Sequence, residues 1–168
     1  SSVMSISDGA FSGCSNIETA DINSQAALDA ISFTNKLTNI KLGDKITSIG
    51  NSKFQNCANL TSVTIPSSVK TIYENTFCDC KNLKSVTLGE GIDSIGRRAF
   101  SGTAIESITI PGSVKTIDQD AFFDCRNLKT VILNEGIENI YDWAFGNTAV
   151  ESVTIPASVK GFNGSVFA

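Results

Sequence analysis

A block of 22 or 23 residues repeats along this chain, and it constrains the fold more than any other feature of the sequence. Residues 60–82 (LTSVTIPSSVKTIYENTFCDCKN) are followed by residues 83–104 (LKSVTLGEGIDSIGRRAFSGTA), and two further blocks fill 105–127 and 128–149. Blocks of one type return after 45 residues, which indicates duplication of a two-repeat unit. A unit of this length cannot bury its apolar side chains alone, so such units are expected to stack into a solenoid.

The repeat frame extends over the whole chain. Repeats begin near residues 17, 37, 60, 83, 105, 128 and 150, and we expect one solenoid domain over residues 1–168 with partial repeats at both ends. Residues 1–6 (SSVMSI) copy the SSVKTI of residues 67–72, with Val3, Ile6 and Phe11 spaced like Val69, Ile72 and Phe77. Because the sequence begins inside a repeat, it is expected to be a piece of a longer or processed protein.

Fixed apolar columns predict the structure of each coil. In the repeat at 60–82 these columns are Leu60, Val63, Ile65, Val69, Ile72 and Phe77. The alternation around Val63 and Ile65 predicts a short strand with one face inward, which Pro66 ends. The Ala-Phe segments are predicted to form short helical or 3₁₀ turns on the outer side. One unit is irregular, since residues 17–36 are only 20 long and their segment 24–33 has helix-like composition.

These features predict an α/β repeat solenoid: a right-handed stack with a parallel sheet of short strands and short helical or 3₁₀ turns outside. Each apolar side chain buried between coils contributes roughly 1.5–3 kcal/mol. The recurring pattern L-x-x-V-x-I-P-x-x-V-x-x-I-x-x-x-A-F-x-x-C-x-x-L resembles the BspA-like class of leucine-rich repeats. The resemblance implies a cell-surface or secreted protein of bacteria or parasitic protists, and members of the class are often implicated in adhesion to matrix proteins or cells.

Composition argues against several other classes of function. The net charge is −4 with no basic cluster, which is unlike a nucleic-acid-binding protein. The chain contains no run of 18 apolar residues, so we expect no membrane insertion of this segment. The chain contains no His, no G-x-S-x-G motif and no phosphate-binding glycine loop, so we expect no enzyme and no cofactor.

Four of the five cysteines share one position of the repeat. Cys14, Cys57, Cys80 and Cys125 each lie three residues after the repeat Phe, where other repeats carry Thr103 and Thr148. A column that accepts Cys or Thr favours a small, partly buried side chain. Cys57 and Cys80 are stacked neighbours that could pair in principle, although side chains pointing the same way fit disulfide geometry poorly. Without His, the lone Cys78-x-Cys80 pair predicts no metal site.

Two surfaces are candidate ligand sites. The outward residues of the predicted strands form a hydroxyl-rich surface with alternating charge at its edge, of which the tentative binding residues are Ser62, Thr64, Lys84, Thr87, Glu106, Thr109, Lys129 and Thr154. Thr is also simply a favourable exposed strand residue. The second candidate is an aromatic patch of Phe123, Tyr141 and Trp143 in the outer loops. These side chains either pack between coils or, if exposed, are the best hot-spot candidates of the chain.

The sequence leaves three hypotheses of function. The leading one is an extracellular protein-binding or adhesion module of a larger surface protein, monomeric, with a protein or glycan ligand on a host or neighbouring cell. The alternative is a structural spacer or stalk without a ligand of its own. An intracellular scaffold is the third, which free cysteines would permit because disulfides favour oxidising compartments.

Overall fold

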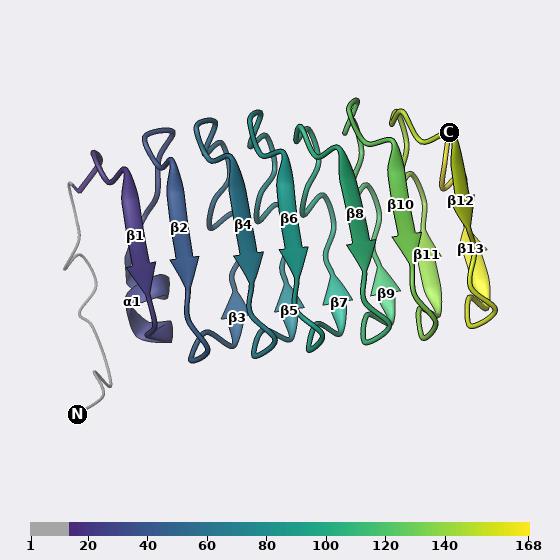
Figure 1. The fold of residues 1–168 in the computed structure, drawn as a ribbon, viewed down its shortest axis with the longest axis horizontal. Coiled ribbons are helices and arrows are strands. Elements are labelled where there is room, and N and C mark those ends of the chain that lie inside the picture. Colours follow the sequence, from purple (N-terminus) through teal and green to yellow (C-terminus); the bar gives the residue numbers. More distant parts are fainter. Residues whose placement is uncertain (1–13) are drawn as a thin grey trace.

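The computed structural model describes residues 14–168, which form a straight stack of coils whose long strands all run in one direction (Figure 1). Each long strand begins two residues after the first residue of a repeat, one strand per coil. The long strands are β1 Thr19–Ile22, β2 Asn39–Leu42, β4 Ser62–Ile65, β6 Ser85–Leu88, β8 Ser107–Ile110, β10 Thr130–Leu133 and β12 Ser152–Thr154. The prediction of a parallel repeat solenoid is confirmed. The prediction for Val3, Ile6 and Phe11 falls outside the described residues.

The long strands alternate between core and solvent as predicted. In β4, Val63 and Ile65 are buried while Ser62 and Thr64 are exposed, and the register pairs Val63 with Val86 and Thr64 with Thr87 of β6. The ladder has two gaps, because hydrogen-bonded pairing links only β1 with β2, β4 with β6, and β10 with β8 on one side and β12 on the other. The strands on either side of each gap are still neighbours in the stack (Figure 1).

A second parallel sheet, which the repeat pattern did not predict, lines another side of the stack. Its six strands are hydrogen-bonded without interruption. They are β3 Ser48–Ile49, β5 Thr71–Ile72, β7 Ser94–Ile95, β9 Thr116–Ile117, β11 Asn139–Tyr141 and β13 Gly161–Asn163. Strands this short give no alternating pattern long enough to recognise, yet the isoleucine of each coil from β3 to β11 is fully buried.

The Ala-Phe segments are short turns on the outer side, as predicted, closed by hydrogen bonds between residues i and i+3, and they do not extend into helix. The backbone N–H of Phe77 donates to Ala99 O of the next coil at 2.7 Å, whereas the N–H of Cys80 donates to Phe77 O of its own coil at 3.2 Å. Residues with positive φ lie on either side of the Phe, namely Asn75 (54°) and Asp79 (58°). A helix would satisfy its amides within the coil and keep φ negative, so the bonds between coils replace it.

The irregular unit does contain a helix, as predicted. Helix α1 spans Gln25–Ala30, begins after Ser24, whose side chain accepts from Ala27 N, and buries Leu28 completely. Lys53 of the next coil donates from Nζ to Asp29 O at 3.0 Å and Ile31 O at 2.8 Å, at the end of this helix. Burial lowers the pKa of Lys53, against the opposing effect of Asp29. The lysine thereby ties the helix to the stack.

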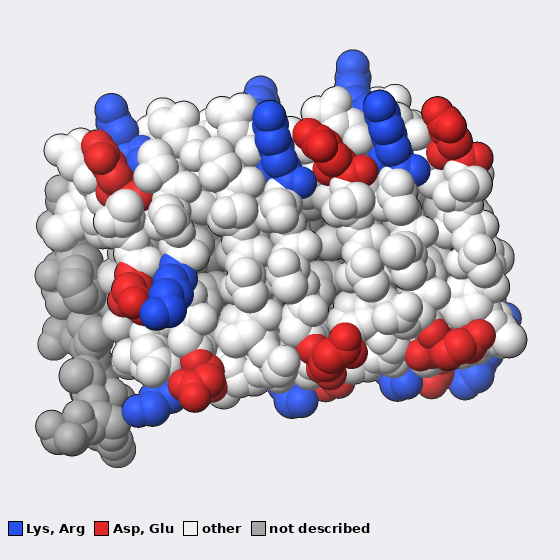
Figure 2. Space-filling model, viewed as in Figure 1, with Lys and Arg blue, Asp and Glu red and all other residues white. Residues whose placement is uncertain are grey.

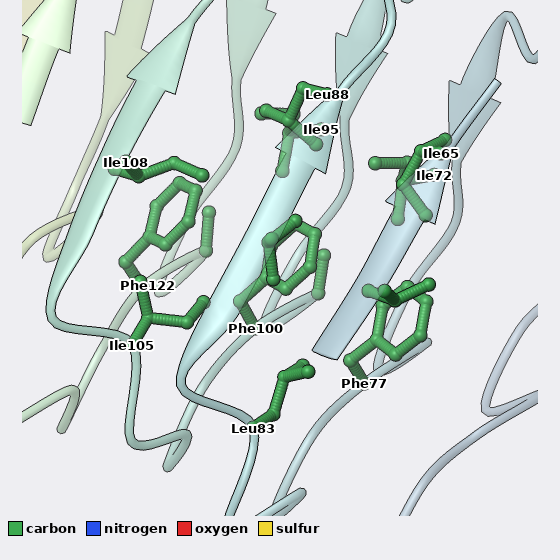
Figure 3. Close-up of a cluster of buried hydrophobic side chains, with 14 of the residues drawn as sticks. Ile65, Ile72, Phe77, Leu83, Leu88, Ile95, Phe100, Ile105, Ile108 and Phe122 are labelled. Carbon is green, nitrogen blue, oxygen red and sulfur yellow. The ribbon is translucent and has the colours of Figure 1, made fainter. Parts of the chain in front are cut away.

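The core is one continuous column of apolar side chains between the two sheets and the turns. Figure 3 shows Phe77, Phe100 and Phe122 from three consecutive coils, facing the same way among isoleucines and leucines of the strands. The stacked rings continue through the whole described stack, with neighbouring centroids 5.0–5.4 Å apart, from Phe33 through Phe54, Phe77, Phe100, Phe122 and Phe145 to Phe167. Parallel, displaced rings at this spacing are a favourable aromatic geometry.

Candidate ligand-binding surfaces

The outward side chains of the long strands form one continuous surface, which we call the long-strand face. All eight residues predicted there are exposed: Ser62, Thr64, Lys84, Thr87, Glu106, Thr109, Lys129 and Thr154. The register places Thr64 beside Thr87, and Thr109 and Thr154 on either side of Ile132. The structure therefore brings the predicted residues onto one face, in columns that cross the coils.

Charge is confined largely to the borders of this face. In Figure 2 the middle of the surface carries almost no charged side chain, whereas basic and acidic groups alternate along one edge. Lys84, Glu106 and Lys129 follow one another in adjacent coils there. The ion pairs among residues 14–168 do not include them, since they join Lys41 to Asp21, Arg97 to Glu74, Arg126 to Asp124 and Lys160 to Glu138. These edge charges are therefore available to a partner.

A shallow hollow of about 220 Å³ interrupts the face at the gap between β6 and β8. Hydroxyl groups of Ser85, Thr87, Ser107 and Thr109 line it, together with Glu90 in the turn below β6. Because the two strands are not joined in a ladder there, the surface opens between them. The hollow offers hydrogen-bonding groups and one carboxylate.

Glu90 and Glu135 occupy equivalent turns 45 residues apart but differ in their contacts. The carboxylate of Glu135 accepts from Ala157 N at 3.0 Å and from Ser158 N at 3.1 Å in the next coil. Glu135 therefore braces a turn. Glu90 makes no side-chain hydrogen bond within the described residues and lines the hollow instead, so of the two only Glu90 is a free turn charge.

Ile132 is an exposed residue that the sequence analysis does not single out. It stands in the column of Thr109 and Thr154, in the middle of the long-strand face, and is 51% exposed. The signal was present in the sequence, because Ile132 replaces Thr in a column that otherwise carries polar residues. An isolated apolar side chain among hydroxyls gives the face one hydrophobic contact point.

The aromatic residues Phe123, Tyr141 and Trp143 lie at the surface, near the end of the stack. The rings of Phe123 and Trp143 meet edge to face with centroids 5.9 Å apart and planes inclined by 72°. Phe123 is half-buried, whereas Trp143 is 38% and Tyr141 37% exposed. Of the two predicted roles, Phe123 therefore has that of packing between coils, while Trp143 and Tyr141 remain accessible to a partner.

The cysteine column is buried and unlinked. Cys57, Cys80 and Cys125 are free and fully buried, and Cys14 is free and exposed. Cys80 Sγ donates to Phe54 O at 3.0 Å and Cys125 Sγ donates to Phe100 O at 3.1 Å. Burial raises the pKa of Cys57 and of Cys125 to about 11. These thiols act as small core side chains that satisfy backbone carbonyls, as the Thr103 hydroxyl does toward Phe100 O.

Among residues 14–168, no group of three or more His, Cys, Asp or Glu side chains is placed to hold a metal ion. None of the helices in the same residues has the length and apolar character needed to span a membrane.

Comparison with known proteins identifies relatives of the chain. The family profile described as BspA type leucine-rich repeat region matches six copies, over residues 1–80 and 47–168. No curated protein sequence matches the chain.

Solved structures of bacterial leucine-rich repeat proteins share the fold. A leucine-rich repeat protein from Bacteroides ovatus is 27% identical over 98% of this chain and 50% of its own, with a TM-score of 0.58. The pneumococcal vaccine antigen PcpA is 30% identical over 87% of this chain and 39% of its own (TM-score 0.63). The T. pallidum leucine-rich repeat protein is 26% identical over 71% and 67% of the two chains (TM-score 0.54). The chain thus spans half or less of the first two relatives.

Proposed function

Because this chain belongs to the BspA type of leucine-rich repeat proteins, we propose that it is an extracellular binding module of a larger cell-surface protein. In this proposal the long-strand face contacts a protein or glycan on a host or neighbouring cell, and the role is adhesion rather than catalysis. The solenoid acts as a monomeric support that presents the face.

One observation carries the proposal: the long-strand face is broad and regular, and from β4 to β12 it is uncharged in its middle. In these coils the columns of Ser and Thr offer donors and acceptors, and Ile132 adds an apolar contact at 51% exposure. Polar, hydroxyl-bearing surfaces of this kind suit wide interfaces with many small contacts. The alternating charges along one edge would orient a partner and increase its rate of association.

The relatives supply a second line of support. One of them is described as a vaccine antigen of pneumococcus. We infer from this description that the present chain is exposed at a cell surface.

Binding can be tested with the full chain and a panel of purified matrix and serum proteins, a glycan array and whole cells. Thr87→Lys combined with Ile132→Lys places two cations in the middle of the long-strand face, and this variant should lose binding to the ligand found. Asp93→Lys, an exposed change just before β7 on the other sheet, is the matched control and should bind normally. If neither the chain nor its parent protein binds anything in the panel, the proposal is wrong.

A spacer role is the second candidate, favoured by the small size of the side chains on the face. Tight interfaces are usually built around Trp, Tyr or Arg anchors, and none of these residues projects from β1 to β12 of the described long strands. Deleting one two-repeat unit, residues 60–104, in the parent protein separates the roles. A spacer should lose reach in proportion to the coils removed while the variant with two lysines on the face behaves normally. A binding module should show the reverse.

A further inference from the structure

Trp143 adopts a backbone conformation that its position in the repeat does not favour. Its φ is +56°, and the equivalent residue of each preceding coil from residue 52 onward also has positive φ: Ser52, Asn75, Arg98 and Asp120. Asn, Asp and Gly accept this left-handed conformation most readily, and a bulky aromatic residue there is an outlier. The left-handed conformation belongs to the repeat in each of these coils, so the backbone at this position does not favour Trp over the smaller residues.

Gly146 and Phe123 make room for the indole ring of Trp143 and pack against it. A Cβ atom on Gly146 would lie 2.6 Å from Trp143 Cε3 and 3.2 Å from Phe123 Cδ2, so only glycine leaves room for the two rings as they lie. Phe123 supports the indole from the preceding coil with the edge-to-face contact described above. We call Trp143, Phe123 and Gly146 the aromatic shelf. The indole is packed against these neighbours, and Trp143 remains 38% exposed.

Unpaired carboxylates lie beside the shelf. Asp120 occupies the same repeat position as Trp143 one coil earlier, and its N–H donates to the carbonyl of Asp142, the residue before Trp143. Asp142 braces Ser165 N through one carboxylate oxygen at 2.7 Å, and neither Asp120 nor Asp142 takes part in an ion pair among residues 14–168.

Two arginines lie in the same area. Arg126 is paired with Asp124 at 2.7 Å. Arg98 occupies the repeat position of Asp120 one coil earlier and makes no ion pair within the described residues. It is the one basic residue at this repeat position from residue 52 to residue 143. Carboxylates beside an exposed indole face attract a cation, and the indole is the strongest aromatic acceptor for a cation–π contact.

We propose that the aromatic shelf is a second binding site, separate from the long-strand face, which holds a Lys or Arg side chain of a partner polypeptide against the indole of Trp143. Asp120 and Asp142 supply the opposite charge. Charge complementarity selects a basic polypeptide over an acidic or purely apolar one. The site does not depend on the long-strand face being a binding surface.

Trp143 is the single tryptophan of the chain, so its fluorescence reports directly on the shelf. Titration of the full chain with a short oligolysine peptide and with an oligoarginine peptide should change the tryptophan emission in a saturable way that weakens with salt. An oligoglutamate peptide of equal length should have no effect. Emission that does not respond to either basic peptide, or that responds to a neutral oligosaccharide instead, overturns the proposal.

Calorimetric titration of variants tests which residues are responsible. Trp143→Asn places a residue suited to positive φ at this position, so the variant should fold, and its affinity for the basic peptide should fall by about tenfold. Asp120→Asn keeps the backbone preference and should also weaken binding. Tyr73→Asn removes an aromatic residue that is 45% exposed on another part of the stack and should leave the affinity unchanged. Equal affinities for wild type, Trp143→Asn and Asp120→Asn would contradict the proposal.

Discussion

The rings of Phe77 and Phe100 lie 5.3 Å apart between centroids with their planes inclined by only 4°. Each belongs to a different coil, and each contacts the ring of the coil before and the coil after it. The side chain that fills the middle of one coil is therefore also part of the interface between coils. Its loss should affect the stability of three coils at once.

Phe77→Ala should reduce the free energy of unfolding by about 3–5 kcal/mol, as for other deletions of a large buried aromatic side chain. Chemical denaturation followed by circular dichroism measures the change. Phe33→Ala is the control, because Phe33 is only partly buried at the irregular coil and its ring is tilted by 32° from that of Phe54. It should cost clearly less, and equal losses for both variants would contradict the interior placement of Phe77.

A thiol reagent should distinguish one cysteine from the other four. Cys14 is exposed, whereas Cys57, Cys78, Cys80 and Cys125 are buried. Burial also raises the pKa of Cys57, Cys78 and Cys125 to about 11, so little thiolate forms near neutral pH. The native protein should react quickly at one site and at the other four only after unfolding, as counted by absorbance or mass spectrometry. Rapid reaction at several sites would mean that the column opens readily.

Stability should fall at alkaline pH because of the same thiols. The folded-state pKa of Cys125 is raised from 9.0 to about 11, so the unfolded chain loses this proton first. Its contribution is present below pH 9.0 and is lost as the pH rises toward 11. Cys125→Thr should reduce this loss while changing stability little at neutral pH, since Thr103 and Thr148 already donate to Phe100 O and Phe145 O in neighbouring coils. Unfolding curves at several pH values measure it, with Cys14→Ser as the unaffected control.

Glu135 and Glu90 form a matched pair for testing the bracing of turns. Glu135→Ala removes two hydrogen bonds to Ala157 N and Ser158 N and should cost about 1 kcal/mol. Glu90→Ala lies in the equivalent turn without such bonds and should change the free energy of unfolding by less than about 0.5 kcal/mol. Thermal denaturation compares the two variants, and a larger loss for Glu90→Ala would show that its carboxylate supports the turn after all.

Lys53 is expected to hold helix α1 in place. Lys53→Met keeps the length of the side chain but removes the donor to the carbonyls of Asp29 and Ile31. Amide hydrogen exchange should then accelerate in residues 25–31, and much less in β4 or β6. Uniform acceleration along the stack would indicate that Lys53 stabilises the whole protein and not this attachment.

The stack and its core could be predicted because the repeat states the same pattern many times. Apolar residues recur in each repeat at the positions of Val63, Ile65 and Phe77, and such a column of apolar side chains is expected to be buried in the interior. The turns around Phe77 could be predicted, but not the hydrogen bonds that lead from them to Ala99 and Ser101 of the next coil. The local sequence indicates helix propensity, but it does not show which backbone amides will donate hydrogen bonds to a neighbouring coil.

The surfaces were only partly predictable for a related reason. Alternation in β4 places Ser62 and Thr64 outside with certainty, since the period of a strand is two. It does not reveal that β6 and β8 separate and form a hollow beside Glu90. The alternation also does not reveal where the Trp143 ring lies, because that position requires the room that Gly146 leaves three residues later.

The two sheets differ in continuity, and this difference has a mechanical consequence. The short-strand sheet is joined without a break from β3 to β13, whereas the long-strand ladder is open between β2 and β4 and between β6 and β8. A solenoid with one continuous sheet and two breaks in the opposite ladder bends most easily by widening the gaps at these breaks. The axis should therefore flex toward the short-strand side, with three stiff blocks of coils fanning apart on the long-strand side. A surface that opens in this way can adjust its curvature to an object larger than itself while its core remains packed.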